Sequence, residues 1–240
     1  MGWDASLQDA LYRFLAADHT RFEAALKLAD SAAWIVCAAV LVALWFGGWR
    51  EGRAENVLTR FSPEARERVL LLLLAMFAAF VIARVIASQW SRTRPLVEQN
   101  ARPPVSAEEW DRVLADQADT GSFPSDRAAF WFALVAGLAM NRPRWAILLG
   151  WGMVLLSGLY VGVGYAYPTD IVGGAVMGAI CVALVFAARR GLHWIAASSA
   201  RLFDALPLVA YPLALLVLLD ITQRFAWTLH AISVVFRLTV

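Results

Sequence analysis

The sequence predicts an all-α protein, a polytopic membrane helix bundle of about six transmembrane helices with an N-terminal interfacial amphipathic helix. Three observations predict this fold. The 240 residues are 60% hydrophobic and only 17% charged, whereas a soluble domain is roughly 45–50% apolar and about 25% charged. The mean hydropathy is +0.60. The apolar residues also form blocks close to the length of about 20 residues that crosses a bilayer.

Charge and cysteine usage exclude other classes of protein. A net charge of +2 is too small to indicate nucleic-acid binding. The two cysteines, Cys37 and Cys181, both lie within apolar runs, which predicts buried thiols rather than disulfides or metal ligands.

Residues 1–30 are expected to form an amphipathic helix at the membrane interface. Leu7, Leu11, Phe14 and Leu15 share one helical face, and acidic residues interrupt the stretch, unlike in a signal peptide. Residues 31–221 are expected to form the membrane bundle, and residues 222–240 an interfacial C-terminal tail. The six predicted spans are 32–48, 69–90, 128–140, 145–165, 171–188 and 202–221.

Two of these spans have special features. The span 128–140 is short, and Pro207 and Pro212 are expected to kink the span 202–221.

Arginines gather in the loops that follow the first, third and fifth spans, so these loops are assigned to the cytoplasm. The loop 91–125 and the turn 167–170 then lie on the outside. One lysine against twenty arginines suggests a GC-rich bacterial genome, and hence a bacterial inner membrane with this face toward the periplasm.

Three segments on the outer face could carry chemistry. Arg92 and Arg94 flank a threonine before Pro95 and could clamp a phosphate, or could serve only as anchors at the headgroup level. In Pro-Ser-Asp-Arg, residues 124–127, Ser125 or Asp126 is expected to cap a helix, whose N-terminus favours anions.

Within that second segment, Arg127 is unusual. A cation in the first turn of a helix opposes the helix dipole, so an anion is expected nearby. The third segment, residues 160–170, ends in Tyr-Pro-Thr-Asp, where Asp170 is a helix cap or an orienting acid. The glycines that follow it permit close helix packing.

The chain resembles the type 2 phosphatidic acid phosphatase superfamily in three motifs and in their order. The motifs are Arg-x-Arg-Pro, Ser-Phe-Pro-Ser-Asp and Tyr-Val-Gly-Val…Tyr-Pro-Thr-Asp. The resemblance covers roughly residues 3–188 and is greatest to the branch with bacterial undecaprenyl-diphosphatases. It implies a metal-independent enzyme that acts on lipid phosphates or diphosphates and needs no cofactor. In such enzymes one histidine attacks phosphorus, an aspartate orients it and a second histidine protonates the leaving group. Arginines, a lysine and a helix-start serine bind the oxyanion.

The chain departs from these family motifs at the chemical positions. The lysine of the first motif would fall at Ala87, and the acid histidine of the second motif is Arg127. Counting back from Asp170 puts the nucleophile at Ala166 and an arginine at Tyr160. Counting forward from Ser157 puts them instead at Gly164 and Gly158. The three histidines of the chain, His19, His193 and His230, are each expected to be interfacial polar residues rather than catalysts.

The resemblance therefore predicts a site that binds a phosphate group without hydrolysing its ester. Arginine keeps its proton near neutral pH, so Arg127 cannot act as a general acid, and without the nucleophile the covalent route is lost. The predicted phosphate ligands are Arg92, Arg94, Ser125 and Arg127, and Asp170 is a remnant orienting acid. No catalytic residue is expected.

Three functional hypotheses follow. The first is a catalytically inactive homologue that binds an anionic lipid phosphate or assembles into a membrane complex, with a membrane-protein partner or as a homo-oligomer. The second is an active lipid phosphatase or phosphotransferase with a rearranged site. The third is a lipid-headgroup carrier that uses the same bundle.

Overall fold

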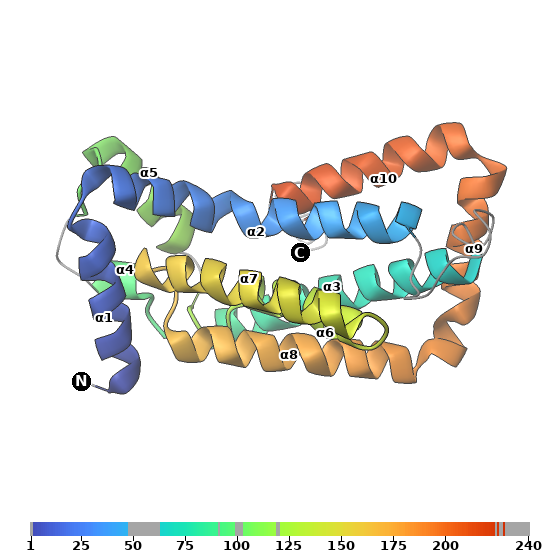
Figure 1. The fold of residues 1–240 in the computed structure, drawn as a ribbon, viewed down its shortest axis with the longest axis horizontal. Helices are drawn as coiled ribbons and strands as arrows, with labels where there is room; N and C mark the ends of the chain where they lie inside the picture. Colours follow the sequence, from blue (N-terminus) through green and yellow to red (C-terminus); the bar gives the residue numbers. More distant parts are fainter. Residues whose placement is uncertain are drawn as a thin grey trace, which may run out of the picture. The chain divides into compact units, whose positions relative to one another are not determined.

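The prediction of an all-α membrane protein is confirmed by the computed structural model, which describes residues 2–47, 63–90, 92–98, 103–118, 121–223, 225 and 228. Within that part of the chain the regular structure is helical (Figure 1). The helices are α1 (Trp3–Ala16), α2 (His19–Gly47), α3 (Pro63–Gln89), α4 (Pro95–Glu98), α5 (Ala107–Ala118), α6 (Asp126–Ala139), α7 (Pro143–Gly162), α8 (Pro168–Ala187), α9 (Arg189–Ala205) and α10 (Pro207–Thr222).

Four helices of the described part are long and apolar enough to cross a membrane, fewer than the six spans expected. They are His19–Phe46, Arg66–Gln89, Pro143–Gly162 and Pro168–Ala187. The other two predicted spans form shorter helices, α6 with 14 residues and α10 with 16. At a rise of about 1.5 Å per residue, such helices are shorter than a hydrocarbon core of about 30 Å. The protein is nevertheless an integral membrane protein by its four long helices.

Several predicted boundaries differ from the observed ones. Residues 1–30 do not form one element, because α1 ends at Ala16 and α2 begins at His19 and continues past residue 30. The expected loop 91–125 contains α4 and α5, and the arginine-bearing loop after the fifth span is helix α9. Pro207 starts α10 instead of kinking it, since proline at the first helical position loses no hydrogen bond, whereas Pro212 lies inside the helix. Of the predicted tail 222–240, only 222, 223, 225 and 228 are described, and His230 lies outside the described residues.

The chain divides into two compact units. Unit 1 comprises residues 1–33 and 71–189, and unit 2 comprises residues 34–70 and 190–240. In unit 2, the first turns of α3 contact helix α9 through an ion pair between Arg66 Nη1 and Asp204 Oδ1 at 2.6 Å and a hydrogen bond between His193 Nδ1 and Glu67 Oε1 at 2.7 Å. All the sequence motifs described above lie in unit 1.

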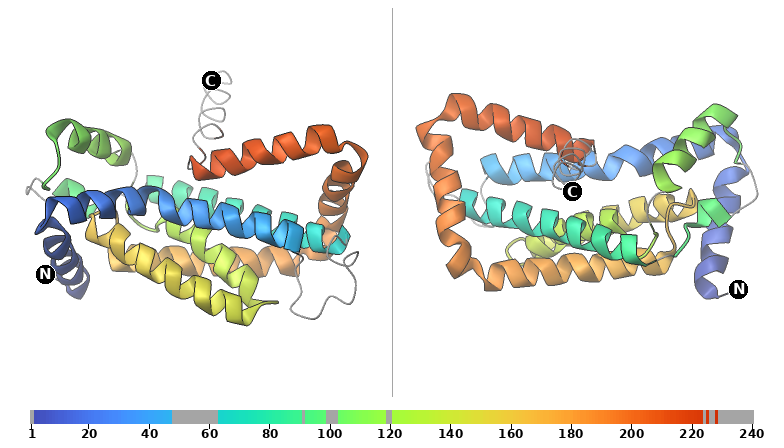
Figure 2. Two further views of the ribbon diagram at one scale, coloured as in Figure 1. Left: turned by 45° about the horizontal axis from the view of Figure 1, so that its top comes forward. Right: turned by 180° about the vertical axis from the view of Figure 1, so that it is seen from behind.

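Unit 1 is organised around the packing of α6 against α8 and α7 (Figure 2). Two glycines of α8 let the backbones of α6 and α8 approach closely. A Cβ atom on Gly174 would lie 2.4 Å from the carbonyl oxygen of Ser125, and one on Gly178 would lie 2.4 Å from that of Ala129. The expectation that these glycines serve close packing is therefore met, and the packing brings the N-terminus of α6 beside that of α8.

Candidate functional site

The three sequence motifs meet at one end of unit 1. The Ser125 amide donates a hydrogen bond to the Asp170 carbonyl at 3.1 Å, joining the start of α6 to the start of α8. The Ser122 amide donates to the Arg92 carbonyl at 2.9 Å, so the chain after α3 joins the same place. Helix α1 packs against α7 and α8 (Figure 1). The site therefore joins α1 to segments that come much later in the chain.

The first group of side chains, the Arg92 cluster, contains Asp4, Arg92, Thr169 and Asp170. Arg92 Nη1 donates to Asp170 Oδ1 at 2.7 Å and to Thr169 Oγ1 at 2.8 Å. Arg92 Nη2 donates to Asp4 Oδ2 at 2.6 Å. The guanidinium carbon also lies 4.2 Å from the centre of the Tyr167 ring, within cation–π distance. Arg92 thus faces two carboxylates of this protein.

Asp170 is fully buried, and both of its carboxylate oxygens are engaged. Oδ1 accepts the hydrogen bond from Arg92, and Oδ2 accepts one from the Tyr167 amide at 2.8 Å, in a capping box at the start of α8. A buried carboxylate is stable only when it is paired and hydrogen-bonded. Arg92 supplies that pairing.

Asp4 of α1 belongs to this cluster although none of the three sequence motifs includes it. Asp4 Oδ1 accepts a hydrogen bond from the Thr169 amide at 3.0 Å, and Oδ2 accepts one from the Thr169 hydroxyl at 2.7 Å. Burial raises the pKa of Asp4, but the hydrogen bonds from Thr169 and Arg92 outweigh burial and hold the pKa below its ordinary value. No local signal could reveal this role, because Asp4 lies 88 residues from Arg92 and reads as an ordinary acidic residue in a first helical turn.

The second group, the arginine–tyrosine cluster, contains Arg94, Arg127, Tyr160 and Tyr165. Each side chain is at least nine-tenths buried. Arg94 Nη1 donates to the Tyr165 carbonyl at 2.8 Å and to the Tyr160 hydroxyl at 3.4 Å, and Nη2 donates to the Gly121 carbonyl at 3.4 Å. The rings of Tyr160 and Tyr165 lie 4.9 Å apart between centroids.

Arg127 approaches the same two rings from α6. Its guanidinium carbon lies 5.1 Å from the Tyr160 centroid and 5.5 Å from the Tyr165 centroid. The expected anion nearby is Asp30 of α2, whose Oδ1 lies 3.7 Å from Arg127 Nη1, too far for a hydrogen bond. Within the part of the chain that the structure describes, this buried Nη1 has no hydrogen-bond partner. A buried donor in this state is costly, so it is a place where a ligand acceptor would be favourable.

Ser125 caps α6, as expected. Its hydroxyl oxygen accepts a hydrogen bond from the Ala128 amide at 3.3 Å, which leaves the hydroxyl proton available for donation. Asp126 is held apart from this role by an ion pair with Arg84 at 3.0 Å. Of the four predicted phosphate ligands, the structure thus places Arg94 and Arg127 together, Ser125 at the start of the helix that carries Arg127, and Arg92 in the other cluster.

The two possible positions of a nucleophile differ in backbone conformation. Gly164 has φ +93°, and a Cβ atom there would lie 3.1 Å from Leu96 Cβ and 3.2 Å from the Leu96 amide nitrogen. A histidine at this position would be strained. Ala166 has no such restriction and is fully buried. Of the two positions, Ala166 is therefore the one whose backbone conformation suits an L-amino acid other than glycine.

Two further observations complete the site. Tyr167 donates a hydrogen bond to Glu98 Oε2 at 2.8 Å, and burial together with this contact raises the pKa of Tyr167 to about 12. The two described histidines contact glutamates elsewhere in the chain. His19 Nδ1 lies 3.9 Å from Glu23 Oε2 on α2, and His193 Nδ1 lies 2.7 Å from Glu67 Oε1 in unit 2. In the described ranges no group of three or more His, Cys, Asp or Glu side chains could hold a metal ion.

The fold and the site define an integral membrane protein of α-helices, with a buried arginine at the start of α4 and another at the start of α6. Comparison with known families agrees with this description. The model of the PAP2 superfamily, the type 2 phosphatidic acid phosphatases, matches residues 68–194, which is more than half of the chain. The chain therefore belongs to the PAP2 superfamily, a lipid-phosphatase-like family. Searches of curated proteins and of solved structures give no match.

Proposed function

We propose that this protein is a catalytically degenerate PAP2 member that binds the phosphate group of an anionic lipid at the arginine–tyrosine cluster. The observation that carries the proposal is the pair of buried guanidiniums, Arg94 and Arg127, on one pair of tyrosine rings. Arg127 brings a donor that has no hydrogen-bond partner in the described part of the chain. Arginine suits phosphate because its planar donors match two phosphate oxygens at once.

The position of Arg127 adds to this preference for an anion. It follows the Ser125 cap in the first turn of α6, where free backbone amides and the helix dipole favour negative charge. Asp30 supplies only one carboxylate, at a separation longer than a hydrogen bond. A phosphate group would add the acceptors that this buried cation requires.

The state of Asp170 supports the loss of catalysis. In the family an aspartate at this motif position orients the nucleophilic histidine. Here one Asp170 oxygen accepts from Arg92 and the other from the Tyr167 amide, and the corresponding nucleophile position is Ala166. Arg127 stands where the acid histidine is expected and keeps its proton near neutral pH. The retained aspartate then serves structure, with Arg92 as its partner in place of an imidazole.

We extend the proposal to the setting of the protein. We place the chain in the undecaprenyl-diphosphatase-like branch, in a bacterial inner membrane, with the site facing the periplasm. In that setting a polyprenyl phosphate is the natural ligand. A protein that binds such a headgroup without cleaving it would act as a binding or assembly subunit of a membrane complex. Purification in mild detergent tests this setting: a stoichiometric membrane-protein partner favours assembly, and a tightly held anionic lipid favours binding.

The binding proposal is tested with the full chain in nanodiscs. The double variant Arg94→Gln/Arg127→Gln should lose affinity for phosphatidic acid over phosphatidylcholine by at least about tenfold, since a charge-assisted hydrogen bond contributes about 1.5–3 kcal/mol. A matched control, Arg144→Gln/Arg190→Gln, removes two exposed arginines and should leave the affinity unchanged. Thermal unfolding in detergent separates loss of binding from loss of folding, and the single variant Arg127→Lys, which keeps the charge, should retain part of the affinity.

Two outcomes would contradict the proposal. Equal affinities of the double variant and the control would make Arg94 and Arg127 structural residues only. Release of phosphate from a lipid diphosphate above the blank, abolished by Asp170→Ala, would show an active enzyme with a rearranged site.

A further inference from the structure

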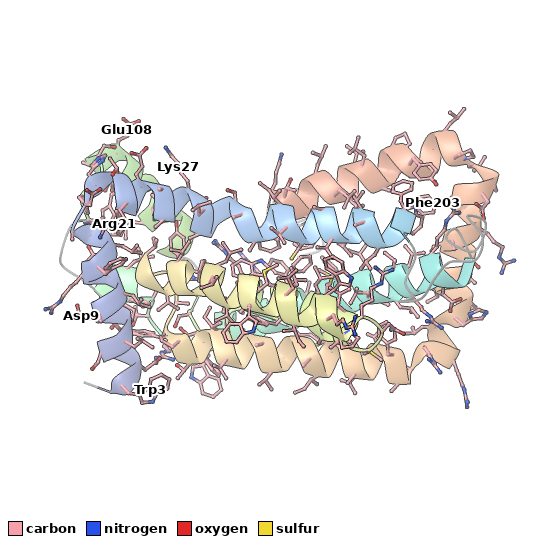
Figure 3. All side chains as sticks on the ribbon, in the orientation of Figure 1. Trp3, Asp9, Arg21, Lys27, Glu108 and Phe203 are labelled. Atoms are coloured by element: carbon pink, nitrogen blue, oxygen red, sulfur yellow. The ribbon has the colours of Figure 1, made fainter. Side chains whose placement is uncertain are left out.

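Helix α9 is held at the ends of two membrane spans by contacts within unit 2. Asp204 pairs at 2.6 Å with Arg66, the first residue of the span in α3. The ring of Phe203, which is labelled in Figure 3, lies 4.5 Å between centroids from that of Trp45, one residue before the span in α2 ends. Spans begin and end near the membrane surface. These contacts therefore hold α9 at the level of that surface.

The axis of α9 runs across that of α3. His193 and Asp204 are separated along α9 by about 16 Å, at about 1.5 Å per residue. They nevertheless contact neighbouring residues of α3, because His193 Nδ1 lies 2.7 Å from Glu67 Oε1 and Asp204 pairs with Arg66. A helix that followed the direction of α3 would separate these two contacts along α3 by the same distance. Helix α9 therefore lies along the membrane surface instead of crossing the bilayer (Figure 1).

The two faces of α9 have different surroundings. The face toward α3 carries Ala196 and Ala200, which are buried, together with His193 and Asp204. The opposite face, called the outer face of α9, is exposed and mainly apolar, and its residues are Trp194, Ile195, Ser198 and Leu202. The Trp194 side chain is the most exposed of the apolar three, at 67%. The outer face is thus an apolar surface at the height of the membrane surface.

We propose that the outer face of α9 docks into the phospholipid bilayer, at the boundary between headgroups and acyl chains. This boundary surrounds a protein at the ends of its spans, and it removes the apolar face of a surface-parallel helix from water. Tryptophan is enriched in the same layer. Arg201, exposed on the edge of the outer face, extends its guanidinium to the phosphate that every phospholipid carries. The surface belongs to unit 2 and is independent of the proposed function.

Spin labels at two neighbouring positions test the inference with the full chain in phosphatidylcholine nanodiscs. The label is attached to Leu202→Cys on the outer face or, as the matched control, to Arg201→Cys on its edge. The native Cys37 and Cys181 are buried and are replaced by alanine in both proteins. Collisions with oxygen, which dissolves among acyl chains, are compared with collisions with a water-soluble nickel chelate. We expect the Leu202→Cys label to meet oxygen and lose access to the chelate, and the Arg201→Cys label to keep that access.

Two results would overturn the inference. Equal access of the chelate to both labels would place the outer face in water. Protection of the Leu202→Cys label from oxygen and chelate alike would mean that a second copy of the chain or another protein covers the face.

A measurement on the unaltered protein decides the matter even if the labelled variants fold poorly. Phosphatidylcholine with a photoreactive diazirine on its acyl chain should form adducts with the peptide that contains Trp194. The exposed apolar helix α10 serves as the internal control for labelling. Adducts on α10 without adducts on the Trp194 peptide would contradict the inference.

Discussion

Arg92 and Arg94 are separated by one residue, yet they lie in opposite electrostatic settings. Arg92 faces the carboxylates of Asp4 and Asp170 and is 32% exposed in its side chain. Arg94 is 7% exposed, and its hydrogen bonds include two to carbonyls and one to a tyrosine hydroxyl. Residues 92–94 lie outside any helix or strand, and the two arginine side chains contact different elements. The same short motif therefore supplies a structural ion pair at one position and a candidate anion ligand at the other.

The difference teaches where positive charge is available for a ligand. At Arg92 the charge is already balanced by the protein, so a ligand must displace a carboxylate. Arg94 donates to carbonyls and a tyrosine hydroxyl, and Arg127 faces two aromatic rings and a single carboxylate, Asp30, at 3.7 Å, beyond hydrogen-bond distance. Substitutions in the two clusters should therefore affect stability and binding in opposite proportions.

The largest effect on stability is expected from Arg92→Gln. It leaves the fully buried Asp170 without its cation, and removing one partner of a buried pair costs about 3–5 kcal/mol, here toward the lower end because Arg92 is partly exposed. Arg94→Gln should cost less stability but more affinity for lipid phosphate. The measurement is unfolding in detergent beside lipid binding for both variants. In the double variant Arg92→Gln/Asp170→Asn the losses should be clearly less than additive, and additive losses would mean that the pair does not couple.

A smaller loss is expected from Gly174→Ala, which disturbs both clusters together. The new Cβ atom would lie 2.4 Å from the Ser125 carbonyl oxygen, and overpacking of this kind costs about 1–3 kcal/mol. Gly152→Ala is the matched control in α7, because its Cβ would meet nothing within 4 Å. That control should be neutral or slightly stabilising, since alanine is the better helix former. Equal unfolding midpoints for the two variants would argue against the close approach of α6 and α8.

The smallest effect is a dependence of α1 docking on pH. The pKa of Asp4 is lowered in the folded protein, so its stabilising contribution is complete above the ordinary aspartate pKa and is lost as the pH falls through the lower folded value. Hydrogen exchange of the Thr169 amide, which donates to Asp4, should therefore be protected at neutral pH and lose that protection in strong acid. Asp4→Asn should remove this dependence, whereas Asp9→Asn should keep it. A dependence that survives in Asp4→Asn would assign it to another carboxylate.

Much of the fold follows from the sequence because bilayer crossing depends on local composition. The long apolar helices α2, α3, α7 and α8 each reach the required length of about 20 residues by their own residues alone. The Ser125 cap and the buried cysteines are likewise local properties. Helix ends were less predictable. In α9, for example, the arginines led to the prediction of a cytoplasmic loop, whereas the segment forms a helix from Arg189 to Ala205.

The sequence by itself determined that this chain is an integral membrane helix protein with PAP2 motifs, and that arginines and an aspartate occur near helix ends. Only the tertiary structure decided how these charges are paired. Asp4 reaches Arg92 across 88 residues, and Asp30 approaches Arg127 across 97, because α1 and α2 pack beside helices that come much later in the chain. Local sequence carries no record of such pairings, since the Coulomb energy of an ion pair depends on separation in space and on burial.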